Sequence, residues 1–396
     1  MITPEHLSPF NKLVLDQFQL QPGLILNDCT LREGEQAAEV NFSVEEKLEI
    51  ARMLAAAGIR QVQGGYPGRS PLDMEAIRRM KEENLPIMVE AITQIFTPDW
   101  KEQIDAAIAS GADIVDLMYP SSNVRLKYVQ KVDRKEMLSR VAEAVRYAVG
   151  RGAIIRYAPT DSTRTELEFL KQVYATALDA GVQRISVADT AGAIGPAGLR
   201  YLVGEIVAFA GPGIPVQVHT HNDLGQGLAN ALAAAEAGAT IIDGTLFGLG
   251  ERSGNACLEE VAAALTIFYG MDLGVDLPKL AETARYVERV AQVPIHPSKP
   301  LLGRDAFAHK LDAHVMGVLA NPVVYEPIPP EMVGNRRHFP LGKYAGPAVL
   351  KARLQQLGLN VSDDRLPQLK TAVERISVEH KRQITDEEIR QLAKEV

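Results

Sequence analysis

The sequence predicts a (β/α)8 barrel followed by a small, mostly helical C-terminal region. From Leu24 onward, short apolar runs alternate with longer helical segments, which is the pattern of consecutive strand-helix units. About eight such units fit within about 250 residues, the usual size of this barrel. Several helical segments end in a small residue followed by glycine, a common helix C-cap that leads into the next strand. A doubly wound open sheet is the alternative architecture.

The first predicted helix has recognisable signals at both ends. Ser43 is a candidate N-cap, Glu46 completes a capping box, and Gly58 ends the helix. Comparable glycine endings occur at Gly111, Gly181 and Gly238. The apolar runs predict strands at residues 24–26, 59–63, 86–89, 113–117, 153–157, 184–187, 214–218 and 240–242. The segments between and after them predict helices at 43–57, 71–83, 98–110, 135–149, 166–180, 196–210, 224–237 and 258–269.

The strand-helix pattern stops after Gly270. Two proline-rich stretches, 292–300 and 321–330, are expected to be extended connectors. A short segment between them carries His309 and His314, and the tail from Pro347 has helical patterning, with Ser377 and Asp386 as turn or cap candidates. We therefore expect a catalytic barrel over residues 1–270, a connector over 271–330 and a helical subdomain over 331–396.

Composition narrows the class of protein. The 396 residues carry a formal net charge of −8, which argues against a general nucleic-acid binder. The two cysteines, Cys29 and Cys257, lie far apart in the sequence, as is typical of a reducing cytoplasm. The sequence shows no leader peptide and no apolar run of membrane-spanning length. We expect a soluble cytoplasmic protein.

Polar residues gather where the first, seventh and eighth predicted strands end. His219 and His221 are two residues apart on a strand, so both imidazoles face the same way and could bind one ion. Such a pair needs at least one more ligand. The loops after the first and eighth strands, 28–36 and 248–255, converge with it in a closed barrel and supply candidates. A structural or solvent-facing histidine pair is the alternative.

Three separate motifs in these loops carry a resemblance to a known family. They are Thr30-Leu31-Arg32-Glu33-Gly34-Glu35-Gln36, His219-Thr220-His221-Asn222-Asp223 and Gly250-Glu251-Arg252-Ser253-Gly254-Asn255. Together they resemble the DRE-TIM metallolyases, which include homocitrate, isopropylmalate and citramalate synthases and hydroxymethylglutaryl-CoA lyase. The likeness extends to Phe307-Ala308-His309-Lys310, His314 and Tyr325, and covers about residues 24–358.

The resemblance implies a divalent cation held by Glu33, His219 and His221, to which Asn255 adds an amide oxygen. Carbonyl chemistry on a 2-oxo acid calls for a cation that polarises the keto group. This mixed set allows Zn²⁺, Mn²⁺ or Mg²⁺, and two imidazoles favour the first two.

Two further residues of the first loop have expected roles. Arg32 is expected to stabilise an enolate or alkoxide oxygen; a salt bridge to Glu251 or Asp223 is the alternative. Asp28 is expected to orient a histidine or Arg32; a capping role in a turn is the alternative.

The resemblance also implies substrate-binding and proton-transfer residues. Gln36, Arg164 and Thr190 match substrate ligands, although Thr190 could equally be a helix-start residue. Acetyl-CoA must lose a methyl proton, a task that the synthases assign to a connector pair matched here by His314 and Tyr325. In the synthases this pair reaches the partner subunit's site, so we expect an obligate homodimer with composite sites. The alternative is a surface histidine and a core tyrosine.

Several positions depart from the family pattern. Thr160 stands where the synthases usually have a glutamate, so either Asp161 takes over its role or the chemistry differs. Thr93-Gln94, Gln217 and Ser121-Ser122-Asn123 also differ from individual synthases. The acceptor acid is therefore open. Because the chain ends at Val396, we expect no leucine-binding regulatory domain.

Three hypotheses follow from these observations. The first is a homocitrate synthase-like acyltransferase that condenses acetyl-CoA, or a close acyl-CoA, with a 2-oxo acid. The second is a lyase that cleaves a 3-hydroxyacyl-CoA, for which Cys257 is a poor match to the expected catalytic cysteine. The third is a metal-binding scaffold or sensor without turnover.

Overall fold

Eight parallel strands form a closed barrel in the computed structural model, which describes residues 3–395. Each strand pairs with the next along the chain, and β1 pairs with β8. The strands are β1 (Ile25–Asp28), β2 (Gln61–Gly65), β3 (Met88–Gln94), β4 (Ile114–Pro120), β5 (Ile154–Thr160), β6 (Arg184–Asp189), β7 (Val216–Thr220) and β8 (Ile241–Gly244). The predicted (β/α)8 barrel is confirmed.

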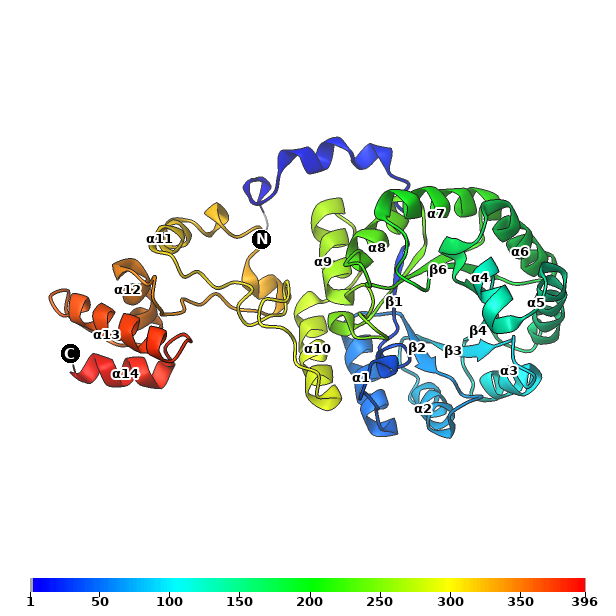
Figure 1. Ribbon diagram of the computed structural model, residues 1–396, viewed down its shortest axis with the longest axis horizontal. Coiled ribbons are helices and arrows are strands. Elements are labelled where there is room, and N and C mark those ends of the chain that lie inside the picture. The colour runs from blue at the N-terminus through cyan, green and yellow to red at the C-terminus, as the bar shows by residue number, and fades with distance from the viewer. Residues whose placement is uncertain (1–2, 396) are drawn as a thin grey trace. The chain divides into compact units, whose positions relative to one another are not determined.

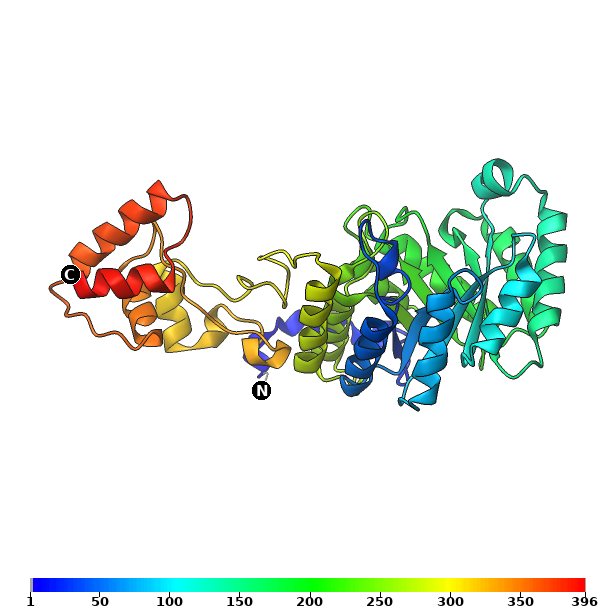
Figure 2. The ribbon, with the colours of Figure 1, turned by 90° about the horizontal axis from the view of Figure 1, so that it is seen from below.

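Helices surround the strands, as Figure 1 shows. They are α1 (Val44–Ala56), α2 (Pro71–Glu82), α3 (Trp100–Ala109), α4 (Asn123–Arg125), α5 (Arg134–Ala148), α6 (Leu167–Asp179), α7 (Pro196–Ala210), α8 (Gly227–Glu236) and α9 (Leu258–Tyr269). Neighbouring helices pack side by side, as α1 and α2 do in both views (Figure 1 and Figure 2).

The end signals of the helices have the predicted geometry. Ser43 Oγ accepts a hydrogen bond from the Glu46 N–H, and the Glu46 carboxylate accepts one from the Ser43 N–H at 2.7 Å. Gly58, Gly111, Gly181 and Gly238 all have positive φ, between +79° and +105°, a conformation that costs glycine least. These glycines end four helices and direct the chain into the next strand.

The barrel unit comprises residues Lys12–Pro294. It extends past residue 270 because α10 (Leu277–Ala291) packs against α1. Strands reach further than the apolar runs suggested: β3 continues to Gln94 and β5 to Thr160. The last of these added residues, Thr93, Gln94 and Thr160, are polar and lie at the carboxyl ends of the strands, where a barrel of this kind carries its site.

The second compact unit consists of two segments, the chain from Ile295 onward and the N-terminal residues up to Asn11. Its helices are α11 (Asp312–Ala320), α12 (Pro347–Gln356), α13 (Leu366–Glu379) and α14 (Asp386–Glu395). Val315, Phe339, Leu350, Val373 and Ile389 belong to its own hydrophobic core. The helical character predicted for the C-terminal region is confirmed.

Ser377 was predicted to be a turn or cap residue, and this prediction is wrong. It lies within α13, where its hydroxyl donates to the Glu374 carbonyl at 3.0 Å. Asp386 is the first residue of α14, and the cap is the residue before it, Thr385, whose Oγ1 accepts from the Glu388 N–H at 3.2 Å. Among residues 3–395, no helix has the length and apolar character needed to cross a membrane.

Candidate metal centre and active site

Glu33, His219 and His221 meet at the carboxyl ends of β1 and β7. Each offers one ligand atom, and these atoms lie within 4.8 Å of one another. The loop after β1 turns tightly because the N–H groups of Arg32 and Glu33 both donate to the Cys29 carbonyl, at 3.1 and 2.7 Å. This turn directs the Glu33 carboxylate to His221, whose Nε2 lies 3.8 Å from Glu33 Oε1.

The loop after β8 brings Asn255 to the same place. Asn255 forms an antiparallel bridge with His221, and its Nδ2 lies 3.1 Å from His219 Nε2. Two glycines allow this close approach. A Cβ on Gly250 would lie 2.1 Å from Asn255 Oδ1, and one on Gly254 would lie 1.9 Å from the Gly248 carbonyl oxygen.

The protonation states of this group suit a cation. Burial, and then the nearby His219, lower the pKa of His221 to about 4, so its imidazole is neutral at pH 7. Burial raises the pKa of Glu33, but its neighbours, above all the Arg32 guanidinium, outweigh burial and hold that pKa below its usual value. A carboxylate and a neutral imidazole are the forms in which these side chains bind metals.

Two polar atoms in the group lack partners. His221 Nδ1 and Asn255 Oδ1 are buried and make no hydrogen bond to any residue that the structure describes. Buried polar atoms are nearly always satisfied, so these two point to a missing ligand. The residues present therefore fit a divalent cation.

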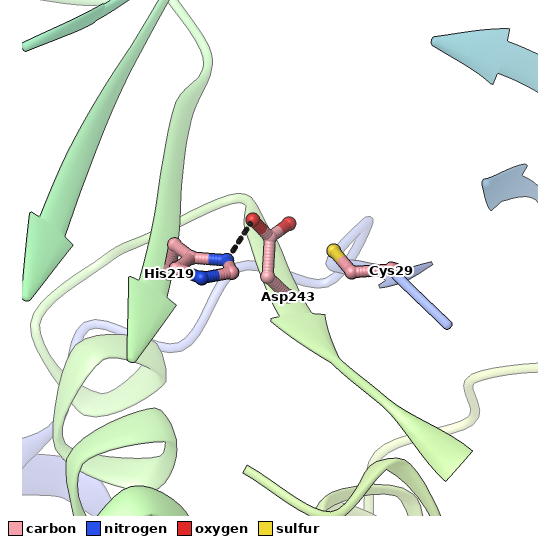
Figure 3. A group of neighbouring side chains, drawn as sticks. All are labelled: Cys29, His219 and Asp243. Atoms are coloured by element: carbon pink, nitrogen blue, oxygen red, sulfur yellow. Dashed lines mark hydrogen bonds and ion pairs between the residues drawn. The ribbon is translucent and has the colours of Figure 1, made fainter. Parts of the chain in front are cut away.

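A second set of potential ligands, Cys29, His219 and Asp243, lies beside the first (Figure 3). In this set the Asp243 carboxylate is already fully engaged. Its Oδ2 lies 3.0 Å from His219 Nδ1, and its Oδ1 accepts from Asn27 Nδ2 at 2.8 Å and Gln217 Nε2 at 2.6 Å. An ion bound between Oδ2 and His219 Nδ1 would displace the hydrogen bond that joins them. The Glu33, His219 and His221 set is therefore the better candidate for a cation site.

Asp28 does not have the role expected for it. Its two carboxylate oxygens accept from the N–H and hydroxyl of Thr30, at 2.9 and 2.7 Å, so it caps the turn after β1. Burial raises the pKa of Asp28 to about 7. The carboxylate that contacts a histidine is instead Asp243, on β8. The sequence feature that could have identified Asp243 is the presence of an acidic residue within the apolar run Ile241-Ile242-Asp243-Gly244.

Arg32 lies at the site and is held from two sides. Its Nε donates to Gln63 Oε1 at 2.9 Å and its Nη2 donates to the same oxygen at 2.5 Å, while Nη1 forms an ion pair with Glu33. The alternative partners, Glu251 and Asp223, pair with Arg252 instead. Gln63, on β2, is a supporting residue that the sequence alone did not single out.

The predicted substrate ligands occupy two places. Gln36 Nε2 donates to the Tyr66 hydroxyl at 3.4 Å, close to Arg32. Arg164 and Thr190 meet at Asp161: Arg164 forms two hydrogen bonds to its carboxylate at 2.8 and 2.9 Å, and Thr190 Oγ1 accepts from its N–H at 2.8 Å. Ser122 Oγ also donates to Asp161, so this carboxylate is occupied. A free base role for Asp161 in place of Thr160 finds no support in these contacts.

The two connector residues contact each other within the second unit. His314, on α11, stacks on Tyr325 with ring centroids 4.2 Å apart and planes 29° apart. Tyr325 is 43% exposed, so it is not a core residue. The next residue, Glu326, is buried; its Oε1 lies 3.0 Å from His309 Nε2, and its carboxylate forms an ion pair with Arg337. These contacts anchor Tyr325 beside His314.

Together the fold and this site define a (β/α)8-barrel protein with a candidate cation centre at the carboxyl ends of its strands. Residues 23–287 match the HMGL-like family model, and residues 301–382 match the homocitrate synthase post-HMGL domain-like model. The chain belongs to the HMGL-like family. The resemblance to the DRE-TIM metallolyases is confirmed.

Named relatives cover most of the chain. The chain is 36% identical over 389 residues to the homocitrate synthase of Methanopyrus kandleri. This match covers 98% of this chain and 96% of that protein. The chain is 40% identical over 339 residues to the 2-isopropylmalate synthase of Sulfolobus acidocaldarius, spanning 86% of this chain and 87% of that protein. These relatives are named as synthases of different products, so they leave the acceptor acid open.

Among solved structures, the HMG-CoA lyase of Bacillus subtilis matches with a TM-score of 0.62 and 19% identity, over 70% of this chain and 96% of that one. Identity at this level supports the barrel fold and no particular reaction.

Proposed function

We propose that this protein is an acyltransferase that condenses acetyl-CoA, or a close acyl-CoA, with a 2-oxo acid and then hydrolyses the thioester. The observation that carries the proposal is the meeting of Glu33, His219 and His221 at the carboxyl ends of the strands, beside Arg32. The names of the synthase relatives, at 36% and 40% identity, support it.

In this proposal Glu33, His219 and His221 hold a divalent cation, and Asn255 contributes its amide oxygen, which has no hydrogen-bond partner in the described chain. When bound, such a cation supplies Lewis-acid polarisation of the 2-oxo carbonyl. The donor set allows Zn²⁺, Mn²⁺ or Mg²⁺, with the two imidazoles favouring Zn²⁺ or Mn²⁺.

Arg32 is suited to stabilise negative charge on the reacting oxygen. A guanidinium has five N–H groups, and three of those on Arg32 donate to Gln63 and Glu33. The remaining two are available to an oxyanion. Burial disfavours the charged guanidinium, but Tyr66, Glu33 and other neighbours outweigh burial and raise the pKa of Arg32, so the group stays cationic. Fixed donors of this kind stabilise a developing charge without reorganisation.

His314 and Tyr325 are the proposed base pair. His314 removes a proton from the acetyl methyl group, the methyl carbon bonds to the keto carbon of the 2-oxo acid, and the former keto oxygen takes up a proton. Water then cleaves the thioester and releases the CoA thiol. Gln36, Arg164 and Thr190 are proposed to bind the carboxylates of the acid, and the stacked rings of His314 and Tyr325 support a joint role.

We further propose a homodimer in which the connector of one chain completes the site of the other. In α11 and the turn that follows it, Met316, Leu319 and Val324 are 61%, 57% and 58% exposed. A run of exposed apolar side chains next to a proposed base supports a contact with a second chain.

The test is a panel of 2-oxo acids offered with acetyl-CoA. Pyruvate, 2-oxoisovalerate and 2-oxoglutarate represent a small, a branched and a dicarboxylic acceptor, and free thiol release is followed with and without a chelator. We expect release that needs both a 2-oxo acid and a bound cation. Release that is independent of the acid would contradict the proposal, as would full activity after exhaustive chelation.

A parallel assay offers hydroxymethylglutaryl-CoA and follows its cleavage, which would indicate the lyase reaction instead. The structure gives that reaction little support at Cys257. This thiol is 3% exposed, lies at the N-terminus of α9 and donates to Glu259 Oε2 at 3.0 Å, so it belongs to the packing of that helix. Cation binding without turnover of any of these compounds would favour the third hypothesis, a metal-binding scaffold or sensor.

A further inference from the structure

The barrel interior below the candidate site contains a buried polar group centred on Asp243. This residue is 2% exposed and belongs to β8, between the strands that carry Asn27 and Gln217. The carboxylate oxygen Oδ1 accepts a hydrogen bond from each of these two amides, at 2.8 and 2.6 Å. Asn27 and Asp243 are also Cα partners in the β1–β8 register. The barrel itself therefore fixes the position of this carboxylate.

The second oxygen of Asp243 contacts His219. Asp243 Oδ2 lies 3.0 Å from His219 Nδ1. A carboxylate is an acceptor only, so the hydrogen bond forms when Nδ1 carries the proton. The other ring nitrogen, Nε2, then presents a lone pair. It lies 3.1 Å from Asn255 Nδ2, an amide nitrogen that can only donate. Both contacts of the His219 ring therefore favour the tautomer with the proton on Nδ1.

The supporting amides extend this arrangement toward Arg32. Asn27 Nδ2 also lies 3.4 Å from Glu90 Oε2, and the same oxygen accepts from Gln63 Nε2 at 2.9 Å. Gln63 in turn accepts from Arg32 through its Oε1. A single set of buried hydrogen bonds thus links the groups that hold His219 and Arg32.

We propose that Asp243 is a positioning residue: it holds His219 in the Nδ1–H tautomer and so presents Nε2 as a ligand to the cation. The inference rests on the proposed cation site. A carboxylate behind a metal-binding histidine fixes both the tautomer and the ring orientation, and its loss typically weakens metal binding by about 10- to 100-fold. Asn27 and Gln217 support His219 indirectly, through Asp243.

The first experiment needs no substitution. The ¹⁵N chemical shifts of the His219 ring in the cation-free full-length protein, assigned by comparison with His219→Ala, report which nitrogen carries the proton. We expect the Nδ1–H form. The Nε2–H form in the wild-type protein would overturn the inference, whatever reaction the protein catalyses.

The second experiment compares Asp243→Asn with the wild-type protein. The new amide can donate to Nδ1 and thereby favours the Nε2–H tautomer, which removes the lone pair from the cation side; a comparable substitution behind a catalytic histidine acts in this way. We expect the ring shifts to report Nε2–H and the affinity for Mn²⁺ and Zn²⁺, measured by chelator competition, to fall by about 10- to 100-fold.

The matched control is Asp116→Asn. Asp116 is equally buried inside the barrel, but its partner is Arg156. We expect this variant to keep the wild-type tautomer and cation affinity. Wild-type affinity in Asp243→Asn would overturn the inference and leave the proposed function standing. Absence of cation binding in the wild-type protein would overturn the proposed function, and the positioning role with it.

Discussion

At the scale of single residues, the site keeps buried side chains charged although burial disfavours the charged form. Glu33 is 1% exposed, yet its pKa stays below the usual value, chiefly because the Arg32 guanidinium lies beside it. Removing one member of such a group leaves the others buried and unpaired, which is costly. Substitutions here are therefore expected to affect binding of the cation and the chemistry together.

His219→Ala is the most direct test of the cation ligands. The variant loses one of two imidazoles and leaves Asp243 without its histidine partner. We expect loss of the bound cation, measured by elemental analysis after gel filtration, and loss of turnover. His380→Ala, which changes an exposed histidine at the end of α13, is the control and should retain both. Full activity in His219→Ala would exclude this site.

Arg164→Ala tests the choice of acceptor. Arg164 has two N–H groups on Asp161, and its side chain is 41% exposed. If it also binds the distal carboxylate of a dicarboxylic acid, its loss removes a charge-assisted hydrogen bond, which contributes about 1.5–3 kcal/mol. We expect KM for 2-oxoglutarate to rise by about 10- to 100-fold and KM for pyruvate to stay unchanged. An equal rise in KM for both acids would mean that Arg164 stabilises the loop around Asp161 and does not bind the distal carboxylate.

At the scale of secondary-structure elements, helix ends are set by local side chains. The capping box of Thr385 and Glu388 at the start of α14 is one example: the Thr385 N–H donates to Glu388 Oε2 at 2.8 Å, and Arg382 forms an ion pair with the same carboxylate at 2.7 Å. Arg382, and then the Thr385 N–H, lower the pKa of Glu388 to about 2. The carboxylate therefore stabilises the helix in its charged form.

This gives a prediction for pH dependence. A pKa that is lower in the folded than in the unfolded chain contributes stability above the unfolded value, near 4.5, and this contribution is lost as the pH falls toward 2. Glu388→Gln should lower the melting temperature at pH 6, and the difference from the wild-type protein should shrink at pH 3. It should also shrink in high salt, because the pair is partly exposed.

Circular dichroism on the full chain measures these melting temperatures. Glu387→Gln, on the exposed side of the same helix, is the control and should have little effect at either pH. A difference between Glu388→Gln and wild type that does not depend on pH would mean that the charge on Glu388 does not stabilise α14.

The sequence predicted the elements better than it predicted the contacts inside them. Helix ends were predictable because Ser43, Glu46 and Gly58 act within one turn of the chain. The three cation-ligand candidates were predictable because strand order alone brings the first and seventh loops together. The roles of Asp28 and Asp243 were not predictable, because they depend on which oxygen faces which neighbour. Asn27 and Asp243 are partners across β1 and β8, at opposite ends of the barrel sequence.

At the scale of the whole molecule, the chain divides into two compact units, and the proposed chemistry uses both. The cation ligands belong to one unit, and His314 and Tyr325 belong to the other. Two residues that stack within a separate unit can serve the barrel of the same chain or that of a partner chain. A subunit-mixing experiment separates these possibilities.

We predict that mixing inactive Arg32→Ala and His314→Ala chains restores activity. If each site combines a barrel from one chain with a connector from the other, a mixed dimer contains one intact site. Random exchange makes half of the dimers mixed, so about one quarter of the wild-type activity should return. Thiol release measures it. Mixing Arg32→Ala with His219→Ala is the control, because both changes fall in the barrel and no site is repaired. Verified exchange without rescue would argue against shared sites.

The N-terminal turn η1 (Pro4–His6) packs against η8 (Pro322–Val324), the turn that leads into Tyr325. Residues Pro4–His6 therefore abut the neighbourhood of the proposed base, although some 300 residues of sequence intervene. Affinity tags, fluorophores and surface couplings placed at the amino terminus would crowd this region and could be mistaken for a catalytic defect.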